Sequence, residues 1–124
     1  MKPADFSAED RVVSIREALR ILDQIWGFTD IEAAEILDTT ADEIRSWREV
    51  PVAEPITDDR LIRVSYILGI HKALDTLVPK RSEHPAFLRR GAPALDGESP
   101  LDVMRQGPAG LRRVRRWLDG ECGW

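Results

Sequence analysis

The 124-residue sequence has a single cysteine, Cys122, and only 6% aromatic residues. One cysteine excludes an internal disulfide and is typical of proteins of a reducing cytosol. The apolar runs are a few residues long, far short of the ~20 that a membrane-spanning helix requires. Residues 1–10 hold three acidic side chains and no apolar stretch, so we expect no signal peptide. These absences predict a cytoplasmic protein that does not contact a membrane.

Motifs for catalysis and metal binding are also missing. No Ser/His/Asp set, glycine-rich phosphate loop or carboxylate pair is recognisable. His84, Asp119 and Cys122 lack the spacing of metal ligands, and we expect His71 to be structural. The sequence therefore predicts no enzymatic activity, no catalytic residue, no metal site and no cofactor.

Charge is distributed unevenly around a net charge of −4. Residues 1–78 hold nine Lys/Arg against sixteen Asp/Glu, a net of −7, whereas residues 79–124 hold nine against six, a net of +3. A protein that grips nucleic acid through its N-terminal half is not usually acidic there. The basic half predicts an acidic counterpart, either a partner surface or the protein's own N-terminal half.

Helical periodicity covers the N-terminal half, and no segment predicts a strand. Apolar residues recur at three- and four-residue steps over residues 8–26, with Ser7 as the N-cap and Gly27 as the stop. Two shorter helices are predicted over residues 30–37 and 41–49. A tight turn between two such helices is the signature of a helix-turn-helix unit.

The packing expected of that unit can be named by residue. Ala34 would lie at the close approach of the two helices, and the buried set would be Leu37, Ile44 and Trp47. Pro51 then enforces a loop, because proline lacks an amide proton and disfavours helix in the preceding residue.

The second of the two short helices carries the candidate DNA-binding residues, Arg45, Ser46 and Arg48. A recognition helix places its N-terminal residues at base edges, and here that end is acidic, with Asp42 and Glu43. The same carboxylates would favourably occupy the first turn of any helix. We therefore favour a structural use of the motif over direct operator reading by one protomer.

The longest helix is predicted over about residues 58–77, capped by Thr57. Its apolar residues occupy more than one stripe, which is typical of a helix packed between two layers. The predicted fold class is all-α: an N-terminal helix-turn-helix-like bundle, residues 1–78, joined by this long helix to a small helical module, residues 79–124.

Two more helices are predicted in the module. Ser99-Pro100 is a strong helix start, because serine accepts an amide proton and proline takes the position where no donor is missed. Gly107 ends this helix. Gly110 and Gly120 are predicted to bracket the last one, whose polar face carries Arg112, Arg113, Arg115 and Arg116.

The order of motifs in the module resembles one protein family. Its members carry an aromatic–leucine pair, a turn ending in glycine, Ser-Pro-Leu with an acidic residue, and a helix closing on glycine. This chain has Phe87-Leu88, Ala94-Leu95-Asp96-Gly97, Ser99-Pro100-Leu101-Asp102 and Gly107. With the N-terminal half, residues 10 to 119 resemble Xre/MbcA/ParS-type antitoxins, the partners of RES-domain toxins.

The resemblance implies an antitoxin of a type II toxin–antitoxin system. Such a protein would bind and block the active site of a RES-domain toxin that degrades NAD or transfers its ADP-ribose, and would repress its own operon. It would form a homodimer within a toxin–antitoxin hetero-oligomer, with operator DNA bound by the assembly. Two alternatives stay open: a free-standing helix-turn-helix transcription regulator, and a helical scaffold that only oligomerises.

The candidate toxin contacts come from the module and its tail, from Trp117 to Trp124. Tryptophan supplies large, stiff anchors at interfaces, and arginine pairs with acidic rim residues. The alternative is that Trp117 is a core residue and Trp124 a frayed end. The predicted toxin-binding residues are Phe87, Leu88, Arg89, Arg90, Ser99, Pro100, Leu101, Arg112, Arg113, Arg116, Trp117 and Trp124.

Overall fold

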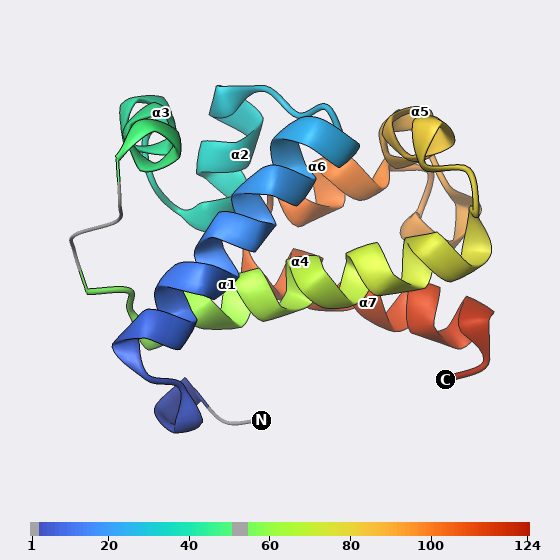
Figure 1. The fold of residues 1–124 in the computed structure, drawn as a ribbon. Coiled ribbons are helices and arrows are strands. Elements are labelled where there is room, and N and C mark those ends of the chain that lie inside the picture. The colour runs from blue at the N-terminus through green and yellow to red at the C-terminus, as the bar shows by residue number, and fades with distance from the viewer. Residues whose placement is uncertain (1–2, 51–54) are drawn as a thin grey trace.

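The structure, a computed structural model, describes residues 3–50 and 55–124 and contains no strand over that part (Figure 1). Short 3-10 or π turns are η1 (Pro3–Asp5), η2 (Ile21–Ile25), η3 (Arg81–Glu83) and η4 (Pro93–Leu95). The α-helices are α1 (Ala8–Arg20), α2 (Asp30–Leu37), α3 (Ala41–Glu49), α4 (Asp58–Leu77), α5 (His84–Arg89), α6 (Pro100–Met104) and α7 (Pro108–Cys122). The all-α prediction is confirmed. Pro51, the residue predicted to enforce a loop, lies outside the described residues.

Serine and threonine caps begin most of the helices. In each case the side-chain oxygen accepts the amide proton of the third helical residue, which satisfies a donor that the helix itself leaves unpaired. The Thr29 cap is reciprocal, because the Glu32 carboxylate accepts the Thr29 amide proton at 2.9 Å. The capping residues are Ser7, Thr29, Thr40, Thr57 and Ser99.

The first helix changes its winding at its C-terminal end. After α1 the chain continues as the π-helical turn η2, in which the Trp26 amide donates to the Ile21 carbonyl at 2.8 Å. Ile21, Leu22 and Trp26 are all fully buried. The predicted helix over residues 8–26 is therefore present, with a wider last turn before Gly27 at φ +67°.

The prediction that Gly110 and Gly120 bracket the last helix is wrong. Helix α7 begins at Pro108, after Gly107 at φ +112°, and ends at Cys122. Gly110 lies inside the first turn of α7, where α6 passes directly over it. A Cβ at this position would overlap the Val103 carbonyl oxygen. Gly110 therefore permits a close helix crossing.

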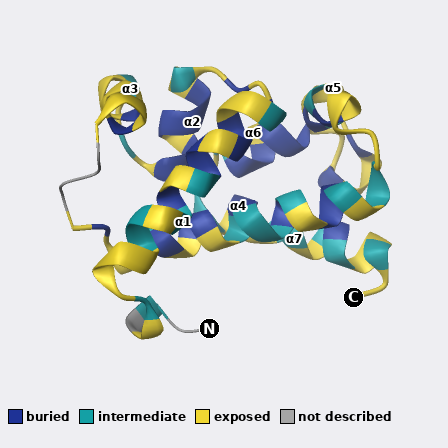
Figure 2. Ribbon diagram, viewed as in Figure 1, coloured by how far each residue is buried: buried dark blue, intermediate teal, exposed yellow. Residues whose placement is uncertain are grey.

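Helix α4 is the central element, as predicted. It packs along α7 on one side and against α1 and α2 on another (Figure 1). Ile67, Ile70 and Leu74 of α4 are fully buried, which explains why its apolar residues spread beyond one stripe. Figure 2 shows the alternation of buried and exposed positions along α1, α4 and α7.

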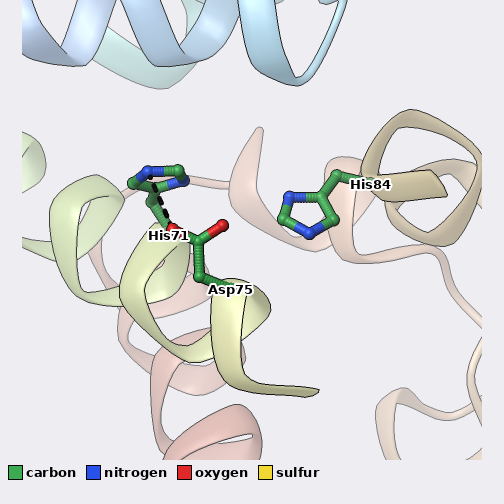
Figure 3. Close-up of side chains that lie close together, drawn as sticks. All are labelled: His71, Asp75 and His84. Atoms are coloured by element: carbon green, nitrogen blue, oxygen red, sulfur yellow. Dashed lines mark ion pairs between the residues drawn. The ribbon is translucent and has the colours of Figure 1, made fainter. Parts of the chain in front are cut away.

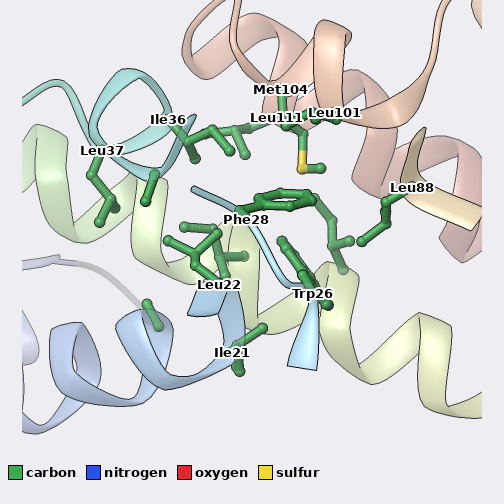
Figure 4. Packing of buried hydrophobic residues seen from close by; sticks show 14 of the residues in the cluster. Ile21, Leu22, Trp26, Phe28, Ile36, Leu37, Leu88, Leu101, Met104 and Leu111 are labelled. Atoms are coloured by element: carbon green, nitrogen blue, oxygen red, sulfur yellow. The ribbon is translucent and has the colours of Figure 1, made fainter. Parts of the chain in front are cut away.

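One hydrophobic core extends through both halves of the chain. Trp26 and Phe28 pack with their ring centroids 5.4 Å apart, and Figure 4 shows them among residues of the C-terminal half, including Leu88 and Met104. The core thus crosses residues 78 and 79, where the sequence predicts a domain boundary. The four N-terminal residues expected to be buried are buried in the structure: Ala34, Leu37, Ile44 and Trp47.

Among the described helices, none combines the length and apolarity needed to cross a bilayer.

Candidate functional site

Two aromatic rings stack on the outer face of the C-terminal half. Phe87 of α5 and Trp117 of α7 lie 6.0 Å apart, centroid to centroid, with their planes 9° from parallel. Both side chains are half-buried. Trp117 is therefore neither a core residue nor a free surface residue, and the stack joins the two helices at the surface. We call these two residues the aromatic pair.

Two shallow cavities flank the aromatic pair. The larger, about 360 Å³, continues from the pair toward the end of α4, and the smaller, about 160 Å³, extends over the turn after α5. Large, well-placed apolar side chains beside open cavities are typical of protein-binding surfaces. The larger cavity is lined by Leu77, Val78, Phe87, Pro93, Ala94, Trp117, Leu118 and Glu121, and the smaller by Phe87, Arg90, Gly91, Ala92, Pro93 and Trp117.

Arg89 is exposed but points toward the N-terminal half. Its guanidinium donates to both Glu32 oxygens, at 2.7 and 2.9 Å, and lies 5.6 Å from the centroid of the Phe28 ring. The Arg89 hydrogen bonds hold the pKa of Glu32 at about 2, well below its usual 4.5, despite the opposing effect of burial. Arg105 makes the corresponding pair with Glu35 at 2.7 and 2.9 Å. These arginines neutralise two carboxylates of the acidic N-terminal half.

The other arginines of the module divide into two sets. Arg113 pairs with Asp96 at 3.0 Å, and Arg115 with Asp119 at 3.6 Å. In the part of the chain that the structure describes, the exposed side chains of Arg90, Arg112 and Arg116 make no ion pair or hydrogen bond. Among the arginines of residues 79–124, these three are therefore left for an external partner.

Four predicted toxin-binding residues lie in the core. Leu88 is fully buried, and Ser99, Pro100 and Leu101 are buried as well. The Ser99 hydroxyl accepts the Asp102 amide proton at 3.1 Å, so its role in this structure is to begin α6. The side chains of these four residues position the module and do not face outward.

Trp124 lines neither of the two cavities beside the aromatic pair. Its amide donates to the Asp119 carbonyl at 3.0 Å, and the Lys72 ammonium lies 5.3 Å from the centroid of its ring. The side chain is 58% exposed. The chain end is thus held against α7 and α4 while presenting one face of the indole.

The three candidate DNA-binding residues lie on α3. Arg45 pairs with Asp42 and, at 3.5 Å, with Asp30. Arg48 pairs with Asp30 as well, and Ser46 is exposed. Carboxylates of the same domain therefore balance both positive charges, which leaves little net attraction for a polyanion.

A known protein family matches the part of the chain that carries the aromatic pair. Residues 73–121 match the family model described as the antitoxin Xre/MbcA/ParS C-terminal toxin-binding domain. The chain is also 39% identical over 66 residues to the uncharacterized protein y4oB of Sinorhizobium fredii, covering 52% of this chain and 51% of that protein. The chain thus spans about half the length of this curated relative.

The family match confirms the resemblance drawn from the motif order, and it supports an antitoxin role in a toxin–antitoxin system. The matched segment begins in the last two turns of α4 and includes α5, α6 and nearly all of α7. It therefore contains the aromatic pair, both flanking cavities and the three unpaired arginines. Residues 73–121 are thus similar to the Xre/MbcA/ParS antitoxin C-terminal toxin-binding domains.

Proposed function

We propose that this protein is a cytoplasmic type II antitoxin that binds a RES-domain toxin and blocks its active site without chemistry of its own. The observation that carries the proposal is the composition of the exposed surface of residues 73–121: an aromatic pair between two cavities, with Arg90 lining the smaller cavity and the exposed Arg112 and Arg116 on the helix that carries Trp117. A toxin that degrades NAD or transfers its ADP-ribose has a pocket open to a dinucleotide. A protein seated over that entrance would stop turnover.

The physical basis of the contact is a rigid surface. Stacked rings present a large apolar area whose side-chain freedom is already restricted, so binding costs little additional entropy. Arg90, Arg112 and Arg116 offer guanidinium groups that form two parallel hydrogen bonds with carboxylates on a partner. We propose these three residues and the aromatic pair as the main toxin contacts, with Trp124 at the edge.

The contact surface is not a removable tail. Leu111, Val114 and Leu118 of α7 are fully buried against the core, so truncation after Gly110 would remove core packing along with the surface. Deleting several fully buried apolar side chains costs far more than the usual margin of stability. Substitutions on the surface, rather than truncation, separate toxin binding from folding.

The direct test is co-expression with a candidate RES-domain toxin, followed by co-purification and a measurement of NAD turnover. We expect Trp117→Ala to weaken toxin binding by about 30-fold or more, as at other central aromatic anchors. Arg112→Glu with Arg116→Glu should weaken it as well. Arg16→Glu on α1 is the matched control, because Arg16 is also exposed but lies outside residues 73–121.

Two results would contradict this assignment. The first is a folded Phe87→Ala/Trp117→Ala variant that binds the toxin and suppresses NAD turnover as well as the parent. The second is equal loss of binding in the Arg16→Glu control, which would place the contact elsewhere or make it a nonspecific charge effect.

We also propose that the antitoxin dimerises through its N-terminal half or α4. Exposed apolar side chains support this, namely Val13 on α1, Ile31 on α2 and Ile62 on α4. Light scattering should give twice the chain mass of 14.1 kDa at tens of micromolar protein. A monomer mass under those conditions would exclude the dimer.

A further inference from the structure

Two histidines and an aspartate meet where α4 ends and α5 begins (Figure 3). His71 and Asp75 lie one turn apart on α4, and His84 is the first residue of α5. One ligand atom from each lies within 4.8 Å of the other two. We propose that these three side chains bind a single divalent transition-metal ion, with zinc as the best match to the ligand set.

His84 already has the arrangement of a metal-binding imidazole. The residue is fully buried, and its Nε2 lies 2.6 Å from the Val78 carbonyl oxygen. A contact that short is attractive only if Nε2 carries the proton, so Nδ1 holds the lone pair. Nδ1 is buried without a hydrogen-bond partner, and Figure 3 shows the ring turned toward Asp75. Metal-bound histidines commonly donate their second N–H to a backbone carbonyl in this way.

His71 supplies the second imidazole. Its Nε2 is 3.5 Å from Asp75 Oδ2, and its Nδ1 is a second buried ring nitrogen without a hydrogen-bond partner. A neutral imidazole has one ring nitrogen whose lone pair can bind a metal ion.

Asp75 lies between the two rings and gives the site its entry path. Its side chain is about one-third exposed, so an ion can reach the carboxylate from solvent. Two imidazoles with one carboxylate suit zinc and similar transition metals, whereas calcium and magnesium prefer oxygen ligands alone. Three protein ligands leave a fourth position for water.

Arg81 is the competitor for this site. Its guanidinium binds both Asp75 oxygens, at 2.8 and 3.0 Å, and its Nη2 lies 3.5 Å from His71 Nε2. The Arg81 side chain is 52% exposed, so it can move into solvent when an ion arrives. If the three residues bind a metal ion, removing Arg81 should raise the affinity for that ion. If Arg81 and Asp75 form a purely structural pair, removing Arg81 should leave the affinity unchanged or lower it.

Metal binding would connect α4 to α5 across the Val78–Glu83 segment. Because α5 carries Phe87, the ion would also restrain one ring of the aromatic pair. The site does not depend on the proposed toxin interaction, and its test requires no toxin.

The first experiment uses the full chain with Cys122→Ser, which removes the only thiol, after treatment with EDTA. Zinc chloride is added at neutral pH and binding is measured by calorimetry and by thermal unfolding. We expect one ion per chain and a rise in Tm of about 10 °C at a hundredfold excess over Kd. The two imidazoles, the only ones in the sequence, should both shift in NMR spectra.

Variants distinguish the site from adventitious binding. Asp75→Asn and His71→Gln should lose saturable zinc binding while retaining helical content, and they avoid the fully buried His84. Arg81→Gln should strengthen zinc binding at least about threefold, because it removes a competing ion pair. Asp96→Asn is the matched control and should change nothing, since Asp96 is exposed, pairs with Arg113 and is not part of the cluster of His71, Asp75 and His84.

The proposal fails if zinc produces no saturable one-to-one binding in the Cys122→Ser protein. It also fails if Asp75→Asn and His71→Gln bind zinc as the parent does, or if Arg81→Gln leaves the affinity unchanged or weaker.

Discussion

The Arg89 guanidinium and the Glu32 carboxylate form a two-point ion pair that joins α5 to α2, fifty-seven residues apart in the chain. Glu32 also accepts the Thr29 amide proton, so one carboxylate both begins α2 and binds the C-terminal module. The acidic and basic halves of the sequence thus meet at this ion pair, which is buried at Glu32 and exposed at Arg89. The pair orients α5, and with it the Phe87 ring.

Replacing Glu32 by glutamine should lower the free energy of unfolding by about 1–2 kcal/mol at pH 7, because the buried end of the pair loses a charge-assisted hydrogen bond. Arg89→Gln should have a similar effect. The matched control is Arg112→Gln, which removes an exposed arginine without an ion pair and should stay within ±0.5 kcal/mol. Urea unfolding followed by circular dichroism measures all three.

The contribution of Glu32 should depend on pH in a defined window. Its folded pKa of about 2 is lower than its usual 4.5, so the stabilisation is fully present above pH 4.5. As the pH falls from about 4.5 to 2, the folded state loses this advantage. The difference in unfolding free energy between the parent and Glu32→Gln should therefore shrink over this range, and a constant difference would contradict the pairing.

Gly110 and Gly120 provide a matched pair on one helix. A methyl group at Gly110 would overlap the Val103 carbonyl oxygen, so Gly110→Ala must push α7 away from α6. We expect a loss of about 2 kcal/mol or more. Nothing lies within 4 Å of a Cβ at Gly120, so Gly120→Ala should stabilise by about 0.5–1 kcal/mol. If thermal unfolding showed equal effects of the two substitutions, α6 would not lie over Gly110.

The position of α4 between its neighbours can be tested with two isoleucines of that helix. Ile67→Asp would bury an unpaired charge and should unfold the protein, whereas Ile62→Asp, at a position 38% exposed, should leave it folded. The measurement is helical circular dichroism with a thermal scan. A soluble, cooperatively melting Ile67→Asp protein would contradict the packing.

A double-mutant cycle measures the aromatic pair itself. Phe87→Leu and Trp117→Leu keep an apolar side chain at each position but remove the stack, and we expect a coupling energy of about 0.5–1.5 kcal/mol. Chemical unfolding of the parent, both single variants and the double variant supplies the four values. Additive effects would show that the rings do not interact in solution.

For DNA, we predict weak operator binding by the isolated chain and tighter binding by the toxin–antitoxin assembly. Several copies of Arg45 and Arg48 would add affinity by multivalency that one acidic domain lacks. Arg45→Ala with Arg48→Ala should reduce binding by the assembly in a mobility-shift or anisotropy measurement. Tight binding by the isolated chain that is insensitive to both changes would falsify α3 as the DNA contact and favour a free-standing regulator.

Most helix limits followed from the sequence because they depend on neighbours within a few residues. Thr29 accepts an amide proton three positions on, and so do Ser7 and Ser99. The predicted helix start at Gly110 was wrong because glycine is typical both of helix ends and of close crossings, and only the position of Val103 distinguishes the two. The spacing of His71 and Asp75 was the only local sign of their cluster, since His84 comes from another helix.

The sequence by itself determined that this chain is helical, where most helices begin, and which antitoxin family its C-terminal motifs resemble. These properties depend on local hydrogen bonds, apolar periodicity and motif order. Only the tertiary structure decided which arginines remain without an ion pair, because pairing depends on residues such as Glu32 and Glu35 that are distant in sequence. It likewise placed Leu88 and Leu101 in the core and Phe87 beside Trp117, since burial is a property of packed helices together.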